Sequence, residues 1–266
     1  MAESAGQASS GDFDKVLVVD LGAQYAQLIA RRVREAHVLS EIVPRSISAA
    51  EVKAMDPVGI ILSGGPASVY SADAYDMDAG ILELGIPTLG ICYGHQMIAH
   101  TLGGEVSRND VAEYGRADLA VLEPSLLLHE LPDEQVVWMS HRDAVTRAPV
   151  GFTVVAETPD SPVAAMEDRE RGIFGVQFHP EVVHTGRGQE ILKHFLYEAC
   201  RARPLWTHIS IIEQSVDAVR TAVDDGAVIC GLSGGVDSSV AAALVHRAIG
   251  DQLVCVFVDH GLLRTD

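Results

Sequence analysis

Short apolar runs alternate with amphipathic stretches over the first hundred residues. The runs are typical of buried strands, and the stretches between them repeat apolar residues at helical spacing. We expect strands over Lys15–Asp20, 38–43, Gly59–Leu62 and Thr88–Ile91, and helices over 24–35, Ala49–Met55, 79–84 and from Gly94 onward. This alternation predicts an α/β fold with a doubly wound, mostly parallel sheet, whose sites form at the carboxyl ends of its strands.

The pattern changes between residues 105 and 177. Short apolar segments over 119–122, 136–139, 154–156 and 174–178 follow one another with turns and no strong helix between them. They predict a partly antiparallel extension of the same sheet. A helix is expected over 189–202, and the segment 203–206 then breaks the pattern.

A second α/β unit is predicted from Ser210. Ser210 and Glu213 have the spacing of a capping box, for a helix that reaches Val223. A strand (227–232), a helix (240–249) and a strand (252–259) are expected to follow. We therefore predict a disordered tail (1–14), a first domain (15–203), a linker (204–209) and the truncated start of a second domain (210–266).

The composition of the chain excludes several classes of partner and location. Nineteen basic against 37 acidic residues give a net charge of −18, which argues against a nucleic-acid partner. No apolar run reaches 18 residues, so no membrane span is expected, and the polar, acidic N-terminus does not resemble a signal peptide. The four cysteines lack metal-type spacing. These features favour a reducing, cytoplasmic location.

Cys92 lies between the strand Thr88–Ile91 and a predicted helix. Gly90 and Gly94 flank it two residues away on each side, as in a nucleophile elbow, where crowded backbones require small residues. The start of a helix also stabilises a thiolate. The alternative is a buried structural thiol, the usual state of a free cysteine.

A cysteine nucleophile needs a base and donors for an oxyanion. His179 and Glu181 are two residues apart in an extended segment, so the carboxylate can hold one ring nitrogen while the other faces Cys92. The backbone N–H groups of Tyr93 and Gly65 are the candidate oxyanion donors. Taken alone, the spacing of His179 and Glu181 could arise by chance. The glycines near Gly65 could likewise form a plain tight turn.

Three segments together resemble the signatures of the class I glutamine amidotransferases: Gly90-Ile91-Cys92-Tyr93-Gly94-His95-Gln96, Ser63-Gly64-Gly65-Pro66 and Phe178-His179-Pro180-Glu181. The resemblance covers residues 15–200 and implies a flavodoxin-like glutaminase domain. It implies Cys92 as nucleophile, His179 as acid and base, and Glu181 as its orienter. It also implies Gly65 and Tyr93 as oxyanion donors, with Gln96 helping to hold substrate glutamine.

A second glycine-rich loop follows the strand expected at 227–232 and opens a helix, a context that suits anion binding. It lacks the lysine of a Walker A loop, and a serine-capped helix is the simpler alternative. The loop resembles that of the N-type ATP pyrophosphatases, which implies ATP as substrate and Mg²⁺ as cofactor. Asp237 is a candidate for placing the ion, whose ligand set stays open. The implied ATP-binding residues are Ser233, Gly234, Gly235, Val236, Asp237, Ser238 and Ser239.

Both loops in one chain resemble the glutamine-hydrolysing GMP synthetase family, as do Asp20–Tyr25, Trp138–His141 and Cys255–Arg264. The resemblance implies amination of ATP-adenylated xanthosine monophosphate with ammonia from glutamine, and a homodimer formed through a region beyond Asp266. Arg142 departs from the family, which usually has glycine there. The alternatives are a glutaminase that supplies another acceptor, and a non-catalytic regulatory module.

Overall fold

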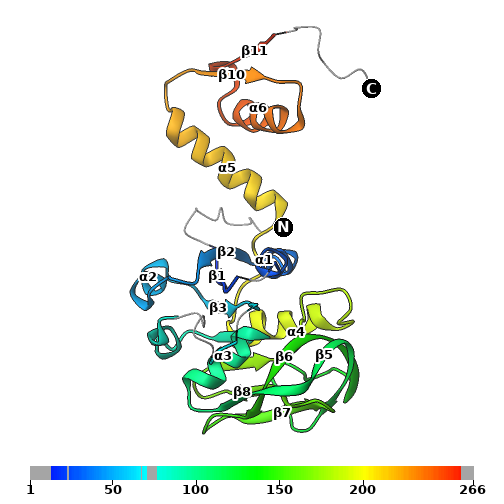
Figure 1. Cartoon of the computed structure of the whole chain (residues 1–266). Helices are drawn as coiled ribbons and strands as arrows, with labels where there is room; N and C mark the ends of the chain where they lie inside the picture. The colour runs from blue at the N-terminus through cyan, green and yellow to red at the C-terminus, as the bar shows by residue number, and fades with distance from the viewer. Residues whose placement is uncertain (1–12, 23, 67, 71–76, 259–266) are drawn as a thin grey trace, which may run out of the picture. The chain divides into compact units, whose positions relative to one another are not determined.

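The computed structural model describes residues 13–22, 24–66, 68–70 and 77–258. The chain divides into two compact units, one formed by Asp14–Leu205 and a second that contains the residues after Leu205. Most of the tail expected over 1–14 lies outside the described residues, as do residue 259 of the last expected strand and the segment that follows it. Figure 1 traces both units.

The first unit is built on a nine-stranded sheet with the order β2-β1-β3-β4-β9-β8-β7-β5-β6. The first five strands in this order are parallel. They are β2 (Leu39–Pro44), β1 (Lys15–Asp20), β3 (Gly59–Leu62), β4 (Thr88–Ile91) and β9 (Ile173–Val176). Four antiparallel strands extend them: β8 (Ser161–Asp168), β7 (Thr153–Thr158), β5 (Glu105–Val121) and β6 (Glu134–Arg147). The predicted fold class is confirmed.

Both faces of the parallel strands are buried. Successive side chains of β1 point to opposite faces, so Val16 and Val18 pack in one core cluster while Leu17 and Val19 pack in another. Helices α1 (Ala26–Glu35) and α4 (Gly188–His194) contribute to the first cluster, and α2 (Ala49–Met55), η1 (Ala79–Glu83) and α3 (Tyr93–Thr101) to the second. Burial on two sides explains why these strands are continuous apolar runs.

The antiparallel extension differs in detail from its prediction. Strand β5 begins at Glu105 rather than near residue 119, because its charged residues conceal a long strand with a register shift between Arg108 and Glu113. Strand β8 was not predicted. Pro162 and two alanines disfavour a strand locally, yet nearly every residue of β8 is buried between β9 and β7.

Two predicted helices take other forms. The segment Ala79–Glu83 is a 3₁₀ helix, with Asp78 capping it through the N–H of Gly80. The helix expected over 189–202 begins at Gly188 as α4 and continues as the π-helix η2 (Phe195–Ala199). Helical periodicity alone does not distinguish these hydrogen-bonding patterns.

The second unit contains α5 (His208–Val223), β10 (Val228–Leu232), α6 (Val236–Ile249), η3 (Gly250–Gln252) and β11 (Leu253–Phe257). Strands β10 and β11 pair in parallel. The predicted cap at Ser210 is wrong by one turn, because Thr207 is the N-cap and Ser210 is the N3 residue of its capping box. Among the described residues, no helix is both long and apolar enough to cross a bilayer.

Candidate active site

Cys92 occupies a strained turn between β4 and α3. Its φ of 53° is a value that residues with a side chain seldom adopt. A Cβ at Gly90 would lie 2.6 Å from backbone atoms of Gly94, and one at Gly94 would lie 2.4 Å from the carbonyl oxygen of Leu62. Glycine is therefore required at both positions, and the segment has the geometry of a nucleophile elbow.

The thiol of Cys92 is buried and lies near polar groups of two other segments. The amide Nε2 of Gln177 donates to Sγ over 3.8 Å, and Sγ lies 3.8 Å from the carbonyl oxygen of Ser140. The N–H of Cys92 donates to the carbonyl oxygen of Val176 at 2.8 Å. Strand β9 therefore fixes the backbone of Cys92.

His179 lies just beyond the end of β9. Its Nδ1 is 2.7 Å from Oε1 of Glu181, and both side chains are buried. The N–H of His179 donates to Trp138 O at 3.0 Å, and its carbonyl accepts from Thr185 Oγ1 at 2.7 Å. Backbone and side chain are both held, so the ring has a fixed orientation.

Burial and charge act in opposite directions on His179. Burial lowers the pKa of the ring, while the charge of Cys92, a hydrogen bond with its thiol and the Glu181 carboxylate raise it, with a net pKa of about 11. The arrangement therefore favours an imidazolium beside the thiol of Cys92. An ion pair of this kind supplies both a nucleophile and an acid.

Gly65 and Tyr93 lie against each other beside the elbow. A Cβ at Gly65 would be 2.8 Å from Leu21 O and 2.9 Å from Cδ1 of Tyr93. The loop is joined to α3 because the N–H of Gly94 donates to Ser63 O at 3.1 Å. These contacts hold Gly65 against the side chain of Tyr93, the residue that follows Cys92.

A cavity of about 850 Å³ opens over the thiol. Cys92, His179, Gly65 and Gln96 line it, and Tyr93 does not. The amide Nε2 of Gln96 donates to Asp143 O at 2.6 Å and to Gln177 Oε1 at 3.2 Å. Gln96 therefore links α3 to Asp143 in the cavity wall and to Gln177. The other lining residues are Gly22, Gln24, Tyr25, Gly64, Pro66, Ser68, Tyr70, Arg108, Tyr114, Ser140, His141, Arg142 and Asp143.

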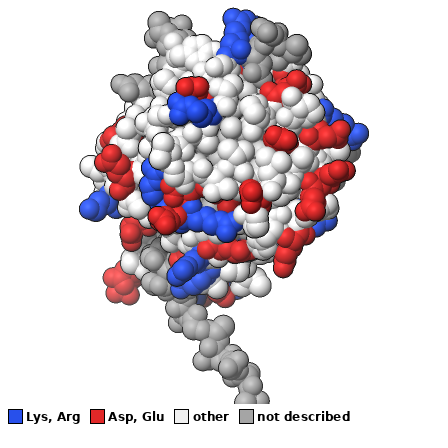
Figure 2. All heavy atoms as spheres, turned by 90° about the horizontal axis from the view of Figure 1, so that it is seen from below, with Lys and Arg blue, Asp and Glu red and all other residues white. Residues whose placement is uncertain are grey.

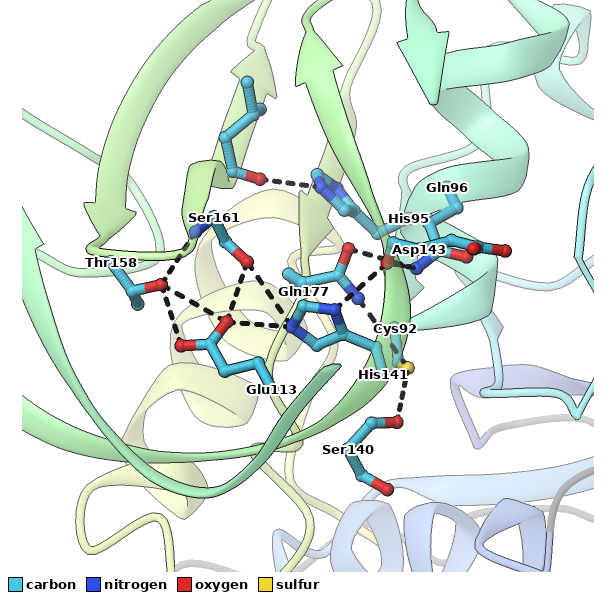
Figure 3. A network of polar contacts seen from close by, with 11 residues as sticks. Cys92, His95, Gln96, Glu113, Ser140, His141, Asp143, Thr158, Ser161 and Gln177 are labelled. Carbon is cyan, nitrogen blue, oxygen red and sulfur yellow. Dashed lines mark hydrogen bonds and ion pairs between the residues drawn. The ribbon is translucent and has the colours of Figure 1, made fainter. Parts of the chain in front are cut away.

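A buried polar network supports the wall formed by residues 140–143, and sequence reasoning did not identify it (Figure 3). His141 Nε2 lies 3.0 Å from Glu113 Oε2, which also accepts from Ser161 Oγ at 2.9 Å. Thr158 Oγ1 donates to Glu113 Oε1 at 3.0 Å, and His141 Nδ1 lies 3.0 Å from Asp143 O. The only signal in the sequence was the Trp138–His141 segment, because Glu113 lies in the part of β5 before residue 119, which was not predicted as strand.

Arg142 and Asp143 both line the cavity. Asp143 accepts hydrogen bonds from Ser68 Oγ and, at 2.7 Å, from Tyr70 Oη. Arg142 is not among the residues with positive φ. Its difference from the usual glycine therefore causes no strain of the left-handed kind, and Arg142 is an exposed residue that lines the cavity.

The predicted ATP loop connects β10 to α6 in the second unit. Gly234 has a φ of 77°, and Gly235 is the N-cap of α6. The hydroxyls of Ser233 and Ser238 lie 3.0 Å apart, and Ser239 Oγ donates to Gly235 O at 2.9 Å. The loop therefore wraps around an exposed helix start, where backbone N–H groups attract anions.

The surface charge agrees with the acidic composition. Figure 2 shows acidic and basic side chains interspersed around one face of the molecule, and the described residues drawn there form no continuous basic patch.

Two family models match the chain. The model of glutamine amidotransferase class-I matches residues 17–199, and that of NAD synthase matches residues 209–260. The first match contains the elbow, the Gly65 loop and the His179–Glu181 pair. The second contains the loop at the start of α6.

Curated relatives and a solved structure are also similar. The chain is 59% identical to GMP synthase (glutamine-hydrolyzing) of Thermobifida fusca over 98% of its length, and 60% identical to that of Parafrankia over 95%. It covers 49% and 47% of those proteins and so spans about half their length. The crystal structure of a putative GMP synthase subunit from Thermoplasma acidophilum superposes with a TM-score of 0.64 at 32% identity, covering 71% of this chain and 94% of that one.

Proposed function

Since the chain belongs to the class I glutamine amidotransferase family, we propose that its domain of residues 15–203 hydrolyses glutamine to glutamate and ammonia. The observation that supports this most is the shared cavity. Cys92 and His179 both line it, and the Glu181 carboxylate contacts Nδ1 of the His179 ring. The nucleophile, the base and its orienter thus come from segments that are far apart in the sequence.

In the first half of the reaction, the Cys92 thiolate attacks the side-chain amide carbon of glutamine. The oxygen becomes an oxyanion, which the N–H groups of Gly65 and Tyr93 stabilise. The imidazolium of His179 gives its proton to the amide nitrogen, the C–N bond breaks, and ammonia leaves. A thioester on Cys92 remains.

In the second half, neutral His179 takes a proton from water, which attacks the thioester carbon. The C–S bond breaks, glutamate leaves, and the thiolate and imidazolium are restored. Glu181 stabilises the imidazolium at each stage. Gln96 helps to hold the glutamine by keeping the 140–143 wall in place.

The second unit has a different proposed role. We place the linker at 204–209 and the start of an ATP pyrophosphatase domain at 210–266, where residues Ser233–Ser239 bind the phosphates of ATP. The exposed loop and the start of α6 are suited to them. Asp237, in the first turn of α6, fits Mg²⁺, which binds through one or two carboxylates together with phosphate oxygens.

The whole protein, by analogy with relatives named GMP synthase (glutamine-hydrolyzing), would make GMP. ATP would adenylate the C2 oxygen of xanthosine monophosphate, and ammonia from Cys92 chemistry would displace the adenylate. We further propose a homodimer formed through the part of the relatives that this chain does not span. All four cysteines are free, which supports a reducing, cytoplasmic setting.

The glutaminase proposal is tested by glutamate and ammonia release from glutamine. The chain alone should show weak release, and Cys92→Ala should abolish it. Cys255→Ala is the matched control, because that thiol is exposed in the second unit. Release that survives in Cys92→Ala, or its complete absence in the parent protein, would refute the proposal and favour a non-catalytic module.

The larger reaction needs a separate test. The chain, extended to the full length of its relatives, should form GMP from ATP, glutamine and xanthosine monophosphate. It should also form GMP from free ammonia when Cys92 is replaced by alanine. Glutaminase activity without GMP formation would instead identify a protein that supplies ammonia to another acceptor.

A further inference from the structure

Four metal-ligand side chains meet on the first unit, outside the cavity over Cys92. His129 and Glu130 follow β5, while His194 ends α4 and Glu198 belongs to η2. One ligand atom from each of His129, Glu130 and His194 lies within 4.8 Å of the other two. The two imidazole rings stack with their centroids 4.0 Å apart. The proposed glutaminase mechanism uses none of these residues.

In each histidine ring one nitrogen makes a hydrogen bond to an acceptor, which determines the nitrogen that keeps its lone pair. His194 Nδ1 lies 2.9 Å from Leu127 O, and a carbonyl can only accept, so Nδ1 carries a proton and Nε2 keeps its lone pair. His129 Nε2 lies 2.7 Å from Glu198 Oε1, which by the same argument leaves the lone pair on Nδ1. Metal-binding histidines are oriented in this way by a carbonyl or a carboxylate.

The loop that carries His129 and Glu130 is fixed before any ligand arrives. The buried carboxylate of Glu167 accepts from Ser125 Oγ at 2.5 Å and from the N–H groups of Leu126 and Leu127, each at 3.0 Å. The side chains of Leu127 and Leu128 are buried in the core. A site built on a rigid loop loses less conformational entropy when it binds.

The helical side of the cluster has an unusual backbone. Glu198 lies in the π-helix Phe195–Ala199, which begins directly after His194. Short π-helical segments often occur at functional sites. Glu130 has a φ of 60°, a left-handed conformation that is rare outside glycine. Both irregularities lie within the four-residue cluster.

We propose that His129, His194 and Glu130 bind one divalent transition cation of the Zn²⁺ class, with Glu198 orienting His129. Two imidazoles and a carboxylate suit Zn²⁺, whereas Mg²⁺ and Ca²⁺ take oxygen ligands. Three protein ligands leave further coordination positions for water, and the partial exposure of both histidines gives access to solvent.

The test is a Zn²⁺ titration of the full chain, without a histidine tag, against a chromophoric chelator. Every protein carries Cys92→Ala, which removes the thiol that could bind Zn²⁺ together with the imidazole of His179. The parent should bind one equivalent, and His129→Gln and His194→Gln should each weaken binding by more than about tenfold. Glu198→Gln should weaken it by about tenfold while the stoichiometry stays at one. His100→Gln, which removes an exposed histidine of α3, is the matched control and should bind as the parent does.

Two outcomes would overturn the site. One is the absence of saturable binding in the parent up to millimolar Zn²⁺, which would leave the cluster as a simple ion pair between His129 and Glu198. The other is unchanged one-equivalent binding in the His129→Gln/His194→Gln double variant. A second readout separates loss of ligands from loss of fold: Zn²⁺ should raise the melting temperature of the parent but not of the double variant, and the two proteins should melt alike without metal.

Discussion

The Nε2 atom of His141 lies 3.0 Å from Oε2 of Glu113, and both side chains are buried. Burial raises the pKa of Glu113, but hydrogen bonds from His141, Ser161 and Thr158 outweigh it and hold the pKa below its ordinary value. The ionised carboxylate is thus the centre of a network that supports one wall of the cavity.

Replacing Glu113 with glutamine should impair substrate binding more than catalysis. The amide leaves some buried donors without an acceptor, so we expect about 1–3 kcal/mol less stability. The 140–143 wall should loosen, and KM for glutamine should rise about tenfold while kcat changes little. Steady-state glutaminase kinetics measure both. Glu157→Gln, an exposed change on β7, is the control. A loss confined to kcat would contradict this role.

The same carboxylate should contribute to stability in a pH-dependent way. Its folded pKa is lower than the ordinary value of 4.5, so its contribution is present above pH 4.5 and is lost as the pH falls through the folded pKa. The free energy of unfolding, measured in urea from about pH 6 down to about pH 3, should therefore fall less steeply in Glu113→Gln than in the parent. Parallel curves would show that Glu113 has no such linkage.

Glu181→Gln should lower both the activity and the pKa of His179. The carboxylate is one of the groups that raise this pKa to about 11, so its loss destabilises the imidazolium. We expect kcat to fall by roughly 10²-fold, the lower range for acid–base catalysis. The imidazole signals of labelled protein, followed by NMR against pH, should titrate at lower pH in the variant.

Glu190→Gln provides the comparison for that experiment, because it removes a partly exposed carboxylate of α4 that pairs with Arg187. It should leave kcat and the His179 titration unchanged. An unchanged titration in Glu181→Gln would show that the carboxylate does not set the protonation of the ring.

Gly90→Ala and Gly94→Ala should each disrupt the elbow. Their Cβ atoms would lie 2.6 Å and 2.4 Å from the nearest backbone atoms, and backbone cannot move aside as a flexible side chain can. We expect a loss of about 1–3 kcal/mol in stability, as for other overpacked sites, and alkylation of Cys92 by iodoacetamide should slow. Gly186→Ala is the control, because no atom lies within 4 Å of its added Cβ. Wild-type reactivity in either elbow variant would contradict the tight geometry.

The parallel half of the sheet was predictable because burial on both faces produces unbroken apolar runs. Strands β1, β3 and β4 have the expected bounds. Strand β8 was missed for the opposite reason: Pro162 and the alanines hide a strand that only its neighbours stabilise. The class I resemblance drawn from the motifs is confirmed by the match over 17–199.

The site shows the same division. Cys92, His179 and Glu181 could be named because local spacing carries their chemistry, although their roles stay predictions. Glu113 could not, because its partners come from β6, β8 and the end of β7. Contacts between distant strands leave no periodic trace in a single sequence.

Strand β9 pairs in parallel with β4 and antiparallel with β8, and its last residue, Val176, accepts the N–H of Cys92. The strand that precedes Cys92 (β4) and the strand that precedes His179 (β9) are therefore adjacent in the sheet, about 4.8 Å apart. Changes of length elsewhere need not disturb that spacing. A circular permutant opened at the exposed turn around Gly151 should keep its glutaminase activity, whereas a one-residue slip between β4 and β9 would abolish it.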